Sequence, residues 1–222
     1  QMLSLMAQTQ GREEDEKKYA KKFISFIDGK IDELKTFKVD FSVIKASYFE
    51  NIDENEEAIK ALEVVAADES FNIDHKFYLA ALYEKVKEYN DSEKIVLNIL
   101  KTHPENAHAW NFLGYSYLER GVKMESAYEY IAKAVKLSPK DGYIRDSLGW
   151  YYYKTGKLDL ALKELRAAIK SEPNDISINK HLAVVYTSLK NFKKAKHYIN
   201  KALKVVQSEK DRAELIEVLK DL

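Results

Sequence analysis

One arrangement of residues occurs twice in succession between residues 107 and 175 and constrains the fold more than any other feature of the chain. Positions are counted from Ala107 in the first copy and from Gly142 in the second. At 100° per residue, positions 4, 7, 8 and 11 of each copy form one stripe of a helix. A proline near the end of each copy cannot continue a helix. Each copy therefore predicts a pair of helices. The shared positions are Trp110, Leu113, Gly114, Tyr117, Gly121, Ala127, Ala134 and Pro139, then Leu148, Gly149, Tyr152, Gly156, Ala161, Leu165, Ala168 and Pro173.

A glycine lies inside the apolar stripe of both copies, at Gly114 and Gly149. Glycine in a helix costs about 1 kcal/mol relative to alanine. We therefore expect a second helix to approach closely at both positions. Pairs of alanines seven residues apart on the second helix of each copy could supply the approaching face.

The arrangement resembles that of tetratricopeptide (TPR) repeats, whose pattern is W-x2-L-G-x2-Y, then A-x3-F and P, with a period of about 34 residues. The resemblance implies an all-α, right-handed superhelical solenoid of antiparallel helix pairs that forms a single elongated body. Residues 118–150 also resemble bacterial multi-repeat proteins, several of which are attached to the cell envelope. Counting by the period, with one extra residue in the turn around Val122, predicts units at 39–72, 73–106, 107–141, 142–175 and 176–209.

The two ends fit the period less well. Residues 1–38 are predicted to form a degenerate repeat, with Tyr19, Phe23 and Ile27 on one apolar face. Residues 210–222 are predicted to form a capping helix, because a solenoid needs its last apolar face covered. Since the chain starts at Gln1 without an apolar leader, we expect a mature or trimmed fragment.

Composition excludes several classes of function. Thirty-six lysines and arginines balance thirty-six aspartates and glutamates, so no overall charge attracts the protein to nucleic acid or acidic lipid. No cysteine is present, and no apolar run reaches the roughly 18 residues of a membrane span. These features leave the compartment open, with the bacterial envelope or periplasm favoured by the resemblance and the cytoplasm as the alternative.

The sequence offers no residues on which to base an enzyme. It has no glycine-rich phosphate loop and no nucleophile elbow. His103, Glu105 and His108 are close in sequence, but they span a loop and a helix start and do not form a helical zinc pair. All five histidines are interpreted as surface or helix-end residues. We therefore expect no metal, no cofactor and no small-molecule substrate.

One sector of each first helix, at positions 2, 5, 9 and 12, is left over once the packing positions are assigned. We call it the first-helix sector. The resemblance to TPR proteins implies that it lines an inner groove where extended or helical peptides bind. Aromatic residues with polar tips, which dominate binding hot spots, gather there. The candidate residues are Phe77, His108, Asn111, Tyr115, Tyr143, Asp146, Trp150, Tyr153 and Lys180.

The main hypothesis is a non-catalytic scaffold that binds a peptide or protein segment in this concave groove. An alternative is a structural or assembly subunit that binds through its convex face or its repeat ends, the groove aromatics merely stacking on each other. A third class, single-stranded nucleic acid stacked on Tyr115, Trp150 and Tyr153, is disfavoured by the neutral charge. The lysine and asparagine set by which some TPR proteins bind chaperone tails is not reproduced in any three successive units.

Overall fold

A computed structural model describes residues 18–19, 22–26, 29 and 37–220 of the chain. The predicted degenerate repeat at residues 1–38 lies mostly outside these residues. Of its expected apolar face, Tyr19 and Phe23 are exposed, and Ile27 is not among the described residues.

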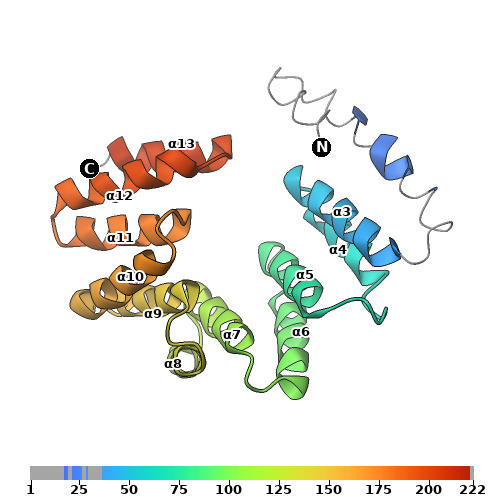
Figure 1. Cartoon of the computed structure of the whole chain (residues 1–222), viewed down its shortest axis with the longest axis horizontal. Coiled ribbons are helices and arrows are strands. Elements are labelled where there is room, and N and C mark those ends of the chain that lie inside the picture. The colour runs from blue at the N-terminus through green and yellow to red at the C-terminus, as the bar shows by residue number, and fades with distance from the viewer. Residues whose placement is uncertain (1–17, 20–21, 27–28, 30–36, 221–222) are drawn as a thin grey trace. The chain divides into compact units, whose positions relative to one another are not determined.

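The described residues from 37 onward form an all-α fold, as the sequence predicted, and consecutive helices pair in antiparallel fashion (Figure 1). Helix α3 packs on α4, α7 on α8, α9 on α10 and α11 on α12. The helices are α3 (Lys38–Asn51), α4 (Asn55–Glu63), α5 (Ile73–Lys85), α6 (Tyr89–Thr102), α7 (Ala107–Arg120), α8 (Met124–Leu137), α9 (Gly142–Lys154), α10 (Leu158–Ser171), α11 (Ile176–Ser188), α12 (Phe192–Val205) and α13 (Glu209–Lys220). No described helix is long and apolar enough to cross a membrane.

The first helices of successive pairs begin with the same kind of N-cap. Asn106, Asp141 and Asp175 accept hydrogen bonds from the backbone N–H groups of Ala109, Ile144 and Ile178 at 2.9, 3.0 and 2.8 Å. Asn72 caps α5 in the same way. Each such cap contributes about 1 kcal/mol, so short polar residues fix where these helices start.

By its contacts the chain divides into two compact units, Gln1–Asn98 and Ile99–Leu222. In a repeat array each repeat contacts only its neighbours, so few contacts oppose such a division. We describe the units separately as the N-terminal and the C-terminal unit.

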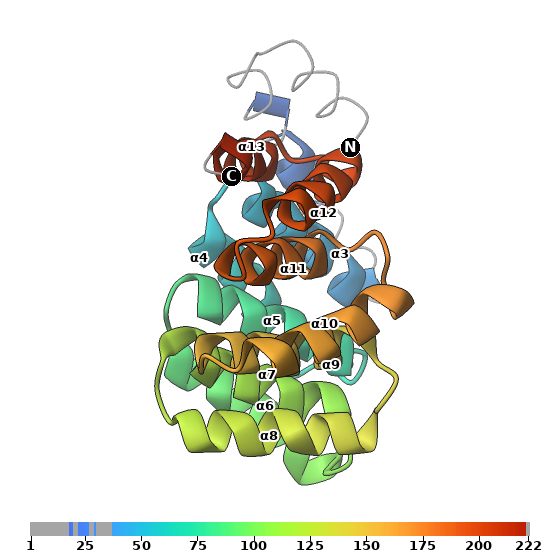
Figure 2. The ribbon, with the colours of Figure 1, turned by 90° about the vertical axis from the view of Figure 1, so that its left-hand side faces the viewer.

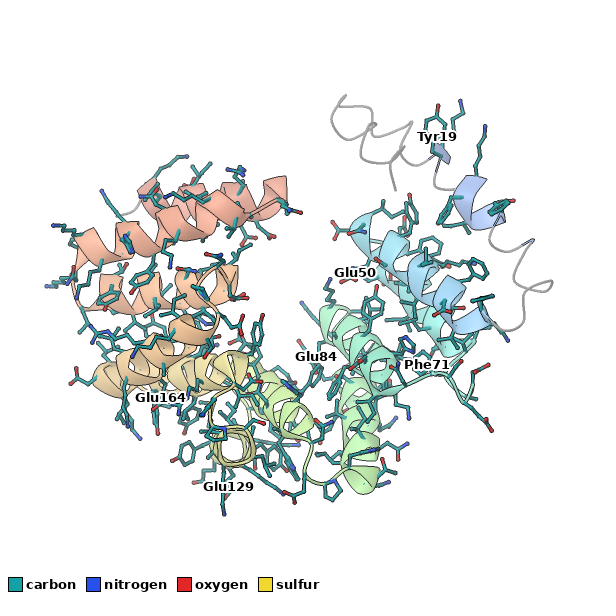
Figure 3. The ribbon with its side chains drawn as sticks, in the orientation of Figure 1. Tyr19, Glu50, Phe71, Glu84, Glu129 and Glu164 are labelled. Carbon is teal, nitrogen blue, oxygen red and sulfur yellow. The ribbon has the colours of Figure 1, made fainter. Side chains whose placement is uncertain are left out.

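In the N-terminal unit, the buried core is formed by α3, α4 and α5. Glu50 of α3, labelled in Figure 3, accepts a hydrogen bond from the Tyr78 hydroxyl at 2.8 Å and forms an ion pair with Lys85. Both partners belong to α5, so the carboxylate joins two consecutive first helices. The core residues include Val39, Ala46, Ala58, Leu62, Val65, Phe71, Leu79 and Leu82.

The C-terminal unit confirms the close helix approach predicted at the two glycines. A β-carbon added to Gly114 would lie 2.9 Å from the Ala127 carbonyl oxygen and 2.7 Å from a side-chain carbon of Ile131. One added to Gly149 would lie 2.7 Å from Leu165 Cγ. Ala127, one of the predicted alanines, thus supplies part of the approach, while Ile131 and Leu165 each lie between the two alanines of a pair; all four alanines are fully buried.

Trp110 differs from its predicted role as a core residue. Its ring is only partly buried, lies 5.1 Å from that of Tyr130 and carries the Lys133 ammonium 3.8 Å above it. Its indole N–H donates to the Pro104 carbonyl at 2.8 Å. The indole is too large for the narrow space between the two helices and therefore extends to their edge.

At the other end of this unit, α13 packs on α12 (Figure 2). Leu215 is 1% exposed in a cluster with Ala183, Ile199 and Ala202. The Arg212 guanidinium donates to the Val206 carbonyl at 2.9 Å, which holds the start of α13 against the end of α12.

Candidate functional site

The C-terminal unit places all the predicted site residues except Phe77 on three first helices, α7, α9 and α11. Helix α9 contacts both α7 and α11, so the three sectors are adjacent. Phe77 belongs to α5 in the N-terminal unit and is described apart from them.

Trp150 forms the centre of this set. Its indole stacks on the imidazole of His181 on α11, with ring centroids 4.0 Å apart and an interplanar angle of 14°. It also stacks on Tyr153, one turn further along α9, at 4.7 Å and 18°. The indole N–H donates to Glu119 of α7 at 2.7 Å, and Lys154 binds the same carboxylate oxygen at 3.0 Å. The ring therefore connects all three helices.

Asp146 and His181 form a buried pair below the tryptophan, which corrects the prediction that Asp146 lies in an open sector. The two residues are 7% and 8% exposed, and Nδ1 of His181 lies 2.9 Å from both carboxylate oxygens. Burial raises the pKa of Asp146, and the charge of Asp175 acts in the same direction. The hydrogen bond and the charge of His181 oppose this shift.

His181 is the functional residue that the sequence interpretation missed, because all histidines were assigned to the surface or to helix ends. It lies in the middle of α11. A signal was available: Asp146 occupies position 5 of its unit and His181 position 6 of the next, positions that meet when consecutive first helices pack.

Two further residues of the sector on α7 are half-buried. Burial raises the pKa of the Tyr115 phenol above its usual range, and the charges of Glu119 and Asp146 add to the shift. The side-chain oxygen of Asn111 is buried and has no hydrogen-bond partner among the described residues. The last position of the sector on this helix, Leu118, is fully buried.

The remaining candidates lie at the edge of the set. Tyr143 is 51% exposed, and slight burial followed by the charges of Glu172, Asp175 and Asp141 raises its pKa. His108 is exposed, with Nε2 3.5 Å from an Asp141 carboxylate oxygen.

Lys180, the one lysine among the predicted site residues, lies on α11. It lies 3.2 Å from the Glu214 carboxylate of α13, so its charge is partly neutralised within the chain. Residues 174–177 and Lys180 border a surface depression with a volume of about 460 Å³, closed on its other side by Val205, Asp211, Glu214 and Leu215.

This arrangement brings several aromatic rings together, and the polar edge of one of them, the Trp150 indole, is held by Glu119. Among the described residues, no group of three or more histidine, aspartate or glutamate side chains could hold a metal ion. The contacts that the described residues make here are aromatic stacking, hydrogen bonds and ion pairs.

Comparison with known proteins gives the same fold. A model of the tetratricopeptide repeat family matches residues 79–142 and 147–210, which together exceed half of the chain. The TPR repeat-containing protein PA4667 of Pseudomonas aeruginosa is 31% identical over 157 residues. That alignment covers 69% of this chain but only 26% of the relative, so the chain spans about a quarter of its length.

Two solved structures have the same helical arrangement. The thermophilic TPR protein TTC0263 of Thermus thermophilus matches with a TM-score of 0.70 at 18% identity, covering 82% of this chain and 99% of its own. PilW, a type IV pilus biogenesis factor, matches with a TM-score of 0.61 at 17% identity, covering 82% of this chain and 89% of its own. At these identities the similarity establishes the fold alone.

Proposed function

Because this chain belongs to the tetratricopeptide repeat family, whose members typically bind other proteins, we propose that it is an interaction scaffold that binds a peptide or protein segment on the first-helix sector of α7, α9 and α11. The family is generally non-catalytic, and we propose that this chain is not an enzyme.

The observation that carries this proposal is the position of Tyr143. Half of this large aromatic side chain is exposed on α9, in the same sector as the half-buried Tyr115, Trp150 and Tyr153. Aromatic residues with a polar tip are enriched in binding hot spots. Rings that are already held by neighbouring groups lose little conformational freedom when a partner binds.

A second candidate function, assembly through the outer face, is favoured by two exposed residues on second helices. Tyr128 of α8 and Leu160 of α10 are 41% and 42% exposed. A partner bound there would contact the aromatic cluster that Tyr128 forms with Tyr151 and Tyr152. It would not touch the first-helix sector.

The two surfaces are distinguished by a matched pair of substitutions. We would capture partners from a bacterial extract with the whole chain, with Tyr143→Ser and with Tyr128→Ser, and quantify each captured protein by mass spectrometry. The two tyrosines are similarly exposed, at 51% and 41%, and neither belongs to the buried core, so circular dichroism should show that both variants fold.

A partner of the first-helix sector should be lost with Tyr143→Ser and retained with Tyr128→Ser. For such a partner, Trp150→Ala should weaken binding by about 2–4 kcal/mol, the range of a hot-spot residue. The reverse pattern of loss would support assembly through the outer face. Partners released by nuclease treatment would indicate nucleic acid instead.

A further inference from the structure

The Asp146–His181 pair joins two consecutive first helices at the point where Trp150 is stacked. Asp146 and Trp150 are one turn apart on α9, whereas His181 comes from α11. The imidazole contacts the carboxylate through Nδ1 at 2.9 Å and the indole through its ring face at 4.0 Å. A change in the charge of this imidazole therefore acts on both contacts at once.

The chemistry of the pair favours one protonation state. When Asp146 is ionised, Nδ1 of His181, 2.9 Å from both carboxylate oxygens, carries the proton and donates it. With a neutral imidazole, the buried pair has a net negative charge, which burial disfavours. With an imidazolium, the pair is neutral overall, and the cation is attracted to the indole face.

Charged and titratable groups around the pair come from α7, α9, α10 and α11. Helix α7 supplies Tyr115 and Glu119, the latter bound to Lys154 of α9. Helix α11 supplies Asp175 and also Lys180, which is paired with Glu214 of α13.

Helix α10 contacts both α9 and α11, and its Glu164 forms an ion pair with Arg145. The carboxylates on the neighbouring helices are thus mostly matched by cations. The Asp146–His181 pair is itself buried, so a proton gained or lost there changes the charge inside the packed helices.

We propose that the Asp146–His181 pair is a proton-operated switch for Trp150: binding of one proton fixes the indole against His181, and loss of that proton weakens the stack. The switch is a property of the chain alone and does not depend on the proposed function.

The direction in which pH changes the fixation of Trp150 follows from the charges of His181 and Asp146. A protonated His181 strengthens the ion pair and the stack, and this contribution is lost as the pH rises. Burial raises the folded-state pKa of Asp146, so its own protonation also favours the folded state at acid pH and that contribution likewise disappears as the pH rises. Protonation of Asp146 itself would remove the anion that holds the imidazolium, so the pair fixes Trp150 most firmly while it carries one proton, and loss of that proton weakens the stack.

The test uses the whole chain labelled with 5-fluorotryptophan, which gives one fluorine signal for each of the two tryptophans. Trp150→Phe assigns the signals. When the pH is raised in steps over the range in which circular dichroism shows the chain to stay folded, the Trp150 signal should shift with a single-proton titration. His181→Gln should abolish that titration and leave the Trp110 signal unchanged.

Two further variants keep the test decisive. His197→Gln removes an exposed histidine that contacts Tyr198 on α12, and the Trp150 titration should persist in this control. Asp146→Asn keeps the side-chain shape and should move the midpoint to lower pH, because no carboxylate then favours the imidazolium. A Trp150 signal that does not titrate, or a midpoint that is unchanged in Asp146→Asn, would overturn the proposal.

Discussion

Trp150 is at once a surface residue and a packed one, and its contacts suggest what its removal would do to stability. We expect Trp150→Ala to lower the free energy of unfolding by about 2 kcal/mol, because each stacked aromatic partner contributes roughly 0.5–1.5 kcal/mol. This is less than the roughly 3–5 kcal/mol lost when a fully buried aromatic is truncated. Urea unfolding monitored by circular dichroism measures the difference.

Trp150→Phe is the matched variant, since it keeps a ring for stacking but removes the N–H that donates to Glu119. It should retain most of the stability. If Trp150→Ala were as stable as the wild type, the stacked geometry would make no contribution, whereas a loss beyond about 3 kcal/mol would identify a core residue.

The glycine in the stripe of α9 gives a second prediction at this scale. Gly149→Ala should destabilise the protein by up to about 2 kcal/mol, because overpacking costs about 1–3 kcal/mol and alanine returns roughly 1 kcal/mol of helix propensity. The added β-carbon would lie 2.7 Å from Leu165 Cγ, inside the core. Thermal unfolding followed by circular dichroism provides the measurement.

A double-mutant cycle checks the cause of that loss. In a Leu165→Ala background the clashing side chain is absent, so Gly149→Ala should cost little or become favourable. An unchanged cost in both backgrounds would show that the strain arises elsewhere.

At the scale of single residues, the sequence predicted the surroundings of small residues better than the burial of polar and aromatic side chains. The close approach at Gly114 and Gly149 follows from period and helix geometry alone. The burial of Asp146 could not be predicted in the same way, because it depends on His181 thirty-five residues away supplying a charge partner. Trp110 illustrates the opposite error: a ring at a packing position is only partly buried, since the space between the helices is narrow.

At the scale of single helices, α13 has the most distinct predicted role. Removing the chain after Ser208 should expose the apolar surface around Ala183, Ile199 and Ala202 that Leu215 covers. We expect the truncated protein to melt earlier and to self-associate, because a large exposed apolar patch promotes association. Sedimentation velocity over a range of concentrations measures the association.

Two point substitutions on α13 separate its buried face from its outer face. Leu215→Ala should cost about 2–5 kcal/mol, as for a buried leucine, whereas Ile216→Ser, at a residue 40% exposed, should change stability little. A truncated chain that stays monomeric and equally stable would rule out a capping role.

Helix positions were predictable for a local reason. The asparagine or aspartate before α5, α7, α9 and α11 is a capping residue that can be recognised without tertiary information. What no local signal predicts is the ion pair between Lys180 and Glu214, because it requires α13 to lie close to α11.

For the whole molecule, the repeat period determines which helices are neighbours, and this explains why the all-α family fold was predictable from two copies of one pattern. The division into two compact units was not predicted, because a repeating sequence contains no mark for the point at which contacts become sparse. Because each repeat contacts only its neighbours, a destabilising substitution should mainly affect the stability of the adjacent repeats.

Leu182→Ala tests this at a fully buried residue of α11. In an array whose stability is a sum of repeat and interface contributions, the loss of about 2–5 kcal/mol should fall mainly on the repeats that contact the defect. Hydrogen exchange measured by mass spectrometry should therefore show faster exchange first in α11 and in its neighbours α9, α10 and α12. Helices α3 and α4 of the N-terminal unit should exchange nearly as in the wild type. A uniform increase along the chain would instead mean that the whole protein unfolds as one cooperative unit, and the neighbour-only description would then be wrong for this protein.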